Sequence, residues 1–187
     1  MREVKCCWIF LIVQLMTMTA VGQNIMQCLG GTATFTSNAP LEVIQAESNQ
    51  LKGVLDKSSK TFAFTVDMQS FEGFNSPLQQ THFNENYMES QKFPMATFKG
   101  KIIENIDFDT PGTYKARAKG KLTIHGVEHE RIIRSDIIID EQGSILISSE
   151  FTILLKDHEI RIPKIVYQKI AEIILVRVTL ILDPKES

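Results

Sequence analysis

The sequence predicts an all-β fold, an antiparallel barrel or sandwich of about eight or nine strands with one or two short helices. Three observations support this prediction. Most of the chain alternates apolar and polar residues with a period of two, as half-buried strands do. Clusters of turn-forming residues separate these segments at regular spacing. Of the 187 residues, 43% are hydrophobic and 22% are charged, a balance typical of a single globular domain.

The clearest strand is predicted between residues 113 and 124. Its even positions form an apolar face that consists of Tyr114, Ala116, Ala118, Gly120, Leu122 and Ile124. Its odd positions include four basic residues, Lys115, Arg117, Lys119 and Lys121. We interpret the basic face as a solvated surface that keeps the sheet from pairing with others, and contact with an anionic partner is the alternative.

Eight further segments are strand candidates. The stronger ones alternate over four or more residues and lie at 62–68, 96–102, 145–155 and 174–182. The shorter or less regular ones lie at 32–37, 41–46, 51–55 and 131–140. No linker or repeat divides them, so we expect one β domain over residues 23–187.

Two segments have helical signals. Ser76, Pro77 and Gln79 match an N-cap, a proline in the first turn and a capping-box partner. The sequence therefore predicts a helix that runs to about Met88 and ends before Pro94. A shorter helix is predicted at 164–171, after Pro163.

The apolar faces also suggest an interior cavity. Small side chains at Ala116, Ala118 and Ala96 leave volume that bulky branched residues would fill, and a barrel of this strand number can hold one small ligand. The alternative is a solid core filled by the phenylalanines. If the cavity exists, alternation predicts that its walls consist of Phe35, Phe62, Phe64, Phe98, Tyr114, Ala116, Ala118, Leu122, Phe151 and Val178.

Residues 1–22 have the features of a secretory signal peptide. Arg2 and Lys5 precede the apolar run 6–18, and the small residues Ala20 and Gly22 fit a cleavage site before Gln23. The run is shorter than the roughly 20 residues of a membrane span. We therefore expect a periplasmic or secreted protein without stable membrane insertion after cleavage. Cys28 is then the only cysteine left, and we expect it to be buried rather than reactive.

Two motifs resemble a known family. Residues 92–98 read Lys-Phe-Pro-Met-Ala-Thr-Phe after a segment that contains His82, Asn86 and Tyr87, and residues 120–127 read Gly-Lys-Leu-Thr-Ile-His-Gly-Val. Together with residues 35–40 and 151–163, these resemble the YceI-like family of periplasmic polyisoprenoid-binding proteins. The resemblance implies a lipocalin-like barrel with a long hydrophobic pore for an isoprenoid tail. It also suggests that His82, Asn86 and Tyr87 lie at the mouth of that pore.

Few residues suggest catalysis or metal binding. His125 and His129 flank Glu128, but Gly126 interrupts the segment, so we expect a solvated hairpin and no metal. His82 lies three residues before Glu85 on the predicted helix, where a structural hydrogen bond is the first interpretation and a contact to a ligand head group the second. No catalytic serine elbow, phosphate-binding loop or dinucleotide motif occurs in the sequence. We therefore do not expect an enzyme.

The sequence thus predicts a protein that carries or sequesters an isoprenoid-like or other amphiphilic lipid, with no other cofactor. A formal net charge of −2 gives no electrostatic reason to bind nucleic acid. The sequence leaves open whether the protein is a monomer or a homodimer. Two alternatives remain: a structural or adhesive β module with a filled core, and an enzyme that acts on a quinone or lipid.

Overall fold

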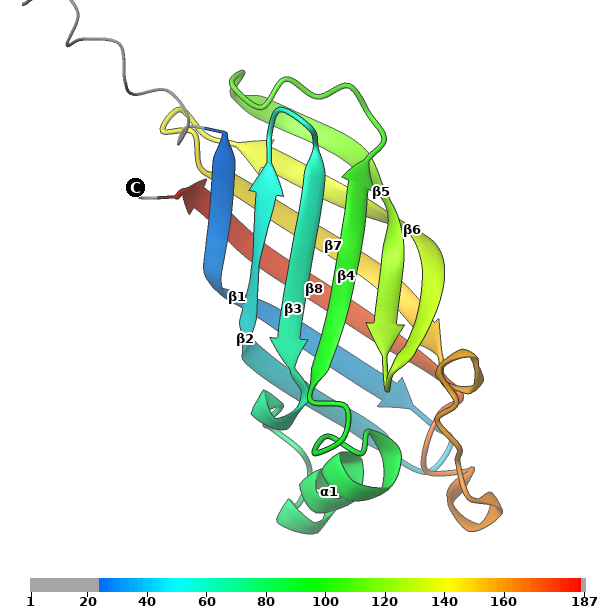
Figure 1. The fold of residues 1–187 in the computed structure, drawn as a ribbon. Helices are drawn as coiled ribbons and strands as arrows, with labels where there is room; N and C mark the ends of the chain where they lie inside the picture. The colour runs from blue at the N-terminus through cyan, green and yellow to red at the C-terminus, as the bar shows by residue number, and fades with distance from the viewer. Residues whose placement is uncertain (1–23, 186–187) are drawn as a thin grey trace, which may run out of the picture.

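The computed structural model describes residues 24–185 and shows a closed antiparallel barrel (Figure 1). Each strand pairs with the next in the chain, and the last pairs with the first. The strands are β1 (Ile25–Asn38), β2 (Val43–Asp56), β3 (Thr61–Asp67), β4 (Met95–Ile102), β5 (Gly112–Ile124), β6 (Val127–Ile139), β7 (Ile145–Leu154) and β8 (Ile173–Pro184). The predicted all-β barrel is confirmed, and the predicted signal peptide lies outside the described residues.

The nine candidate segments form eight strands because two of them are one strand. Segments 41–46 and 51–55 join in β2, which continues through the polar stretch between them. β1 is also longer than predicted and includes residues 25–31. Its register against β2 shifts on both sides of Gly31, where a Cβ would approach the Leu180 Cβ to 2.7 Å. The bulge at this glycine lets the long strand bend around the barrel.

The predicted first helix is present. α1 (Pro77–His82) is capped by Ser76, whose hydroxyl accepts a hydrogen bond of 3.2 Å from the Gln79 amide, and a π-helical turn extends the helix over Phe83–Tyr87. The predicted second helix is wrong in length, because only Lys164–Val166 forms a 3-10 turn. The rest of that segment bonds to the β1–β2 region instead: the Leu41 amide donates to the Gln168 carbonyl.

The two ends of the barrel differ in their loops. We call the end that carries residues 39–42, 68–94, 125–126 and 155–172 the mouth end; in Figure 1, α1 lies there. We call the opposite end, with the turns 57–60, 103–111 and 140–144, the closed end. At the mouth end, β5 and β6 meet in a two-residue turn in which His125 and Gly126 have φ of 52° and 74°. Glycine tolerates this left-handed backbone without strain, which explains Gly126 in the turn.

The core is solid toward the closed end. Met26, Ile145 and Leu182 are almost completely buried there, and Phe108 from the β4–β5 loop is 4% exposed. Cys28 is buried in the same region, as predicted, and its thiol lies 3.6 Å from the Leu51 carbonyl oxygen. The barrel is therefore stabilised by large side chains at this end.

Candidate functional site

A cavity of about 540 Å³ extends from the mouth end into the barrel as far as Leu55, Phe62 and Ile102, which lie next to the closed-end turns. All eight strands contribute to its walls, and most of the lining side chains are aliphatic or aromatic. Leu55, Phe62, Ile137, Ile147 and Leu180 line the part of the cavity that is nearest to the packed core of the closed end. The volume is within the range of small-molecule pockets, which is about 300–1,000 Å³. Buried side chains that do not line the cavity, such as Met26, Phe108, Ile145 and Leu182, form a packed core beside it, so the solid core that the sequence left as the alternative fills only part of the barrel.

Most of the wall residues that alternation predicted do line the cavity. Nine of the ten predicted wall residues line the cavity: Phe35, Phe62, Phe64, Phe98, Ala116, Ala118, Leu122, Phe151 and Val178. Tyr114 does not line it. Its position nearer the closed end lets its hydroxyl donate to the Thr110 carbonyl at 2.9 Å. A role of these residues in ligand binding stays a prediction.

Two of the three predicted mouth residues line the cavity. They are His82 and Tyr87, and burial raises the pKa of the Tyr87 phenol above its ordinary value. Asn86, in the π-helical turn, is exposed and lies outside the lining. Within residues 24–185, no hydrogen bond to the His82 ring occurs, so the structural hydrogen bond expected for it is not observed. The alternative, a contact to a ligand head group, stays a prediction.

An aromatic cluster at the mouth end was not predicted. Phe83, in the π-helical turn that follows α1, stacks on Phe35 of β1 with a centroid distance of 5.2 Å. Phe71 and Phe74 pack against the same two rings at 5.1–5.9 Å. All four rings line the cavity, so the cluster both attaches the α1 segment to the barrel and forms part of the wall. The isolated phenylalanines of the β3–β4 connection were the signal for it in the sequence.

Gly120, which the sequence pattern placed on the small-residue face, does not line the cavity. It lies opposite Gly100 in the β4–β5 pair. A Cβ on Gly120 would come within 2.3 Å of the Lys99 carbonyl oxygen. These glycines therefore permit a close approach of two strands and add no interior volume.

Polar groups gather at the mouth. The Glu42 carboxylate accepts a hydrogen bond of 3.0 Å from the Gln79 side-chain amide, which links the β1–β2 turn to α1. Lys169, from the β7–β8 connection, also lines the cavity there. Acceptors and donors of both charges thus surround an apolar interior, an arrangement that suits an amphiphile with its polar head at the opening.

A seam in the wall separates the mouth-end halves of β6 and β7. The two strands pair only between Ser135–Ile139 and Ile145–Ser149. Beyond that point side chains bridge the gap: Arg131 donates to the Thr152 carbonyl at 2.7 Å, and His129 bonds to the Asp157 carbonyl. The seam replaces a continuous β ladder with separate side-chain bonds.

The prediction of a solvated hairpin at His125 and His129 is wrong. His125 bonds to the His158 carbonyl at 3.1 Å and to Glu89 at 2.8 Å, and its side chain is 12% exposed. His158 is fully buried against His129, and burial lowers its pKa below 6.5. The late loop covers the hairpin, a tertiary contact that local sequence does not show. No group of three metal-ligating residues occurs within residues 24–185.

The basic face of β5 is neutralised by its neighbours. Lys115, Lys119 and Lys121 pair with carboxylates of β6 at 2.6–2.8 Å. Arg117 pairs with Glu104 at 2.7 Å. This geometry favours the interpretation of a solvated strand face, because little positive charge is left for an anionic partner.

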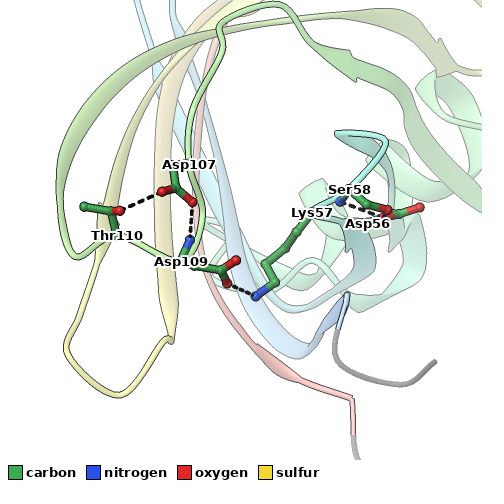
Figure 2. A network of polar contacts seen from close by, with 6 residues as sticks. All are labelled: Asp56, Lys57, Ser58, Asp107, Asp109 and Thr110. Carbon is green, nitrogen blue, oxygen red and sulfur yellow. Dashed lines mark hydrogen bonds and ion pairs between the residues drawn. The ribbon is translucent and has the colours of Figure 1, made fainter. Parts of the chain in front are cut away.

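At the closed end, polar contacts connect the loops. Lys57 and Asp109 form an ion pair of 2.6 Å between the β2–β3 turn and the β4–β5 loop (Figure 2). Asp56 accepts hydrogen bonds from the amides and hydroxyls of Ser58 and Ser59, which lower its pKa to about 2. Figure 2 shows a similar turn in which Asp107 accepts from Thr110 and the Asp109 amide.

The family model for the YceI-like domain matches residues 28–182. The chain belongs to the YceI-like family. The match spans β1 to β8, so the family domain is the whole barrel, and the resemblance seen in the sequence is confirmed. No curated protein matches the chain.

Solved structures share the YceI-like fold at low sequence identity. A polyisoprenoid-binding domain from Saccharophagus degradans, implicated in plant cell wall breakdown, is 12% identical with a TM-score of 0.73, and the match covers 87% of this chain and 99% of that one. BcnA of Burkholderia cenocepacia is 14% identical with a TM-score of 0.66 and coverage of 81% and 95%. The Campylobacter jejuni YceI protein is 19% identical with a TM-score of 0.55 and coverage of 74% and 81%. Within residues 24–185, no helix has the length and apolar character to cross a bilayer.

Proposed function

We propose that this YceI-like protein is a secreted or periplasmic binding protein that holds an amphiphilic lipid with an isoprenoid-like tail, as a carrier or a sequestering protein. One observation carries the proposal: the cavity of about 540 Å³ has mostly apolar walls on all strands, and the charged side chains that line it, Glu42 and Lys169, lie at the mouth. A hydrocarbon tail gains roughly 0.8 kcal/mol for each buried methylene, so it binds such walls without hydrogen bonds. The polyisoprenoid-binding domain of Saccharophagus degradans has the same fold, which agrees with this ligand class.

In this proposal the protein binds the lipid and does not catalyse a reaction on it. The cavity walls offer hydroxyls such as those of Ser135 and Ser149, which lie 2.7 Å apart and hydrogen-bond to each other. An activated serine nucleophile has a basic group as its hydrogen-bond partner. In this pair, each hydroxyl is bonded to another hydroxyl instead. The periplasmic or secreted location rests on the signal-like features of residues 1–22.

Native mass spectrometry of the protein isolated from its own host tests the proposal. We expect a population that is heavier than the apo chain by the mass of one lipid, which dissociates on activation. If the protein is purely apo and takes up no added polyprenyl lipid, the proposal is wrong.

A variant with a blocked cavity locates the bound tail. Ala118 is half-buried and lines the cavity, so Ala118→Phe should fill part of it and reduce lipid uptake at least about tenfold. Ile132→Phe is the matched control, because Ile132 lies on the outside of β6 and is exposed. Equal uptake by both variants would show that the tail lies elsewhere.

A further inference from the structure

Exposed apolar side chains surround the mouth end. They come from the β1–β2 turn, the start of β2, α1, the β7–β8 connection and the start of β8, and are Leu41, Val43, Leu78, Ile165, Tyr167 and Ile173. Ile165 is the extreme case, with 91% of its surface exposed. Water-exposed isoleucine of this degree, grouped with other apolar residues around an opening, is typical of an interaction surface.

The surface is continuous with the cavity. Leu78 is exposed and also lines the cavity. In the β7–β8 connection, Val166 and Ile170 line the cavity while their neighbours Ile165 and Tyr167 are exposed. A lipid tail therefore stays in contact with apolar side chains when it moves from an apolar phase at this surface into the cavity.

The charge on the β7–β8 part of this surface is positive, whereas Glu42 lies between Leu41 and Val43 on the β1–β2 side. Residues 161–170 contain Arg161, Lys164 and Lys169 and no acidic residue. None of these three cations forms an ion pair with a described residue, in contrast to the basic face of β5. Exposed isoleucine, an interfacial tyrosine and free cations on one short segment fit the boundary of a membrane that contains anionic lipids.

The segment is held in place before any partner binds. The Leu41 amide donates to the Gln168 carbonyl at 2.9 Å, and the Ala171 amide donates to the Ser37 hydroxyl at 2.9 Å. These bonds fix residues 161–170 to the end of the barrel beside the opening. A preformed surface loses little conformational entropy on binding.

We propose that the mouth end docks reversibly on the surface of a bilayer with anionic lipids, with Ile165 and Tyr167 in the interface and Arg161, Lys164 and Lys169 at the head groups. Docking places the mouth of the cavity against the lipid phase. The inference rests on the proposed function, since it gives the route by which an insoluble tail enters the cavity. The docked protein stays peripheral, because only side chains enter the interface.

Flotation with lipid vesicles tests the docking. The wild-type protein is mixed with vesicles of phosphatidylglycerol and phosphatidylethanolamine, and with vesicles of phosphatidylcholine alone. We expect flotation with the anionic vesicles, a loss with increasing salt, and weaker flotation with phosphatidylcholine. No flotation with the anionic vesicles overturns the proposal.

Two matched variants locate the contact. Ile165→Asp should reduce vesicle binding at least about tenfold, because it places a carboxylate in the interface. Ile181→Asp changes the same residue type on the outer wall, where Ile181 is 55% exposed, and should bind as the wild type does. Because all forms have the same N-terminus, this comparison cancels any contribution from residues 1–22. Equal loss in both variants, or no loss in Ile165→Asp, overturns the proposal.

Two further measurements separate the proposals from each other. Uptake of a fluorescent fatty acid from vesicle-free solution reports on the cavity alone, and Ile165→Asp should retain it. If uptake fails while docking is observed, the proposed lipid-binding function is wrong and the surface still docks. If light scattering shows a wild-type dimer that Ile165→Asp converts to a monomer, without vesicle binding, the surface pairs two copies and the docking proposal is wrong.

Discussion

The two ends of this barrel are built from the same eight strands, but they differ in how their interiors are filled and in which contacts connect their loops and strands. At the closed end, side chains such as Leu182 and Phe108 fill the interior, and an ion pair between Lys57 and Asp109 connects two loops. At the mouth end, the interior is a cavity, and a seam between β6 and β7 is bridged by side chains. Packing for stability and space for a ligand thus involve different sets of side chains in one barrel, because a region that admits a ligand cannot also be tightly packed.

Truncation in the closed end should have the largest effect on stability. Phe108→Ala removes a ring that is 4% exposed, and we expect a loss of about 3–5 kcal/mol in the free energy of unfolding. Urea denaturation measures it. Lipid affinity of the folded fraction should stay within about twofold of wild type. A large loss of affinity would show that the two ends are coupled.

The matched truncation at the mouth should have the opposite profile. Phe83→Ala removes a half-buried ring of the aromatic cluster, so we expect a loss of only about 1–2 kcal/mol. Because the ring attaches the α1 segment beside the cavity, lipid should dissociate several times faster, as stopped-flow displacement would show. If Phe83→Ala destabilises the fold as much as Phe108→Ala, the mouth is part of the stability core.

Mild acid should weaken the mouth end first. Burial lowers the pKa of His158 below 6.5, and His129 and Arg131 lower it further, while the Val127 carbonyl and Asp157 oppose them. Below pH 6.5 the His158 ring is therefore protonated in the unfolded chain while it stays neutral in the folded chain. The free energy of unfolding decreases as the pH falls through the pKa of folded His158. Between about pH 7.5 and about pH 5.5 we expect the Tm to fall by roughly 2–4 °C.

His158→Leu provides the control for this pH effect. The variant has no ionisable group at this position, so its Tm should change less with pH over the same range. An identical pH slope in the variant and the wild type would show that another group controls the acid sensitivity.

The closed end should respond only to stronger acid, and with the smallest effect. Hydrogen bonds from Ser58 and Ser59 lower the pKa of Asp56 from 3.8 to about 2. The stabilisation by ionised Asp56 is thus complete above about pH 4 and disappears as pH falls through about 2. Asp56→Asn should be less stable than wild type at neutral pH, with the difference vanishing near pH 2 in acid-unfolding curves. A difference that does not depend on pH would contradict the assigned pKa.

Much of the architecture follows from local patterns. Alternation along residues 113–124 and 145–154 places each side chain on the correct face, because successive strand residues point to opposite sides. Ser76 and Pro77 start α1 where the capping pattern predicts. Tyr114 was assigned to the cavity because it shares a face with Ala116 and Ala118, and alternation does not tell how far along the barrel axis a residue lies.

Which part of the barrel interior is hollow depends on the tertiary structure. Most strand positions, their inner faces and the family motifs at residues 92–98 and 120–127 could be predicted from the sequence, since each depends on residues near each other in the chain. The cavity depends on the summed volume of side chains that eight strands bring to one level, and on the loops that cover each end. The seam and the cover over His125 arise in the same way, from contacts between segments about 30 residues apart. A local pattern of period two carries no information about such contacts.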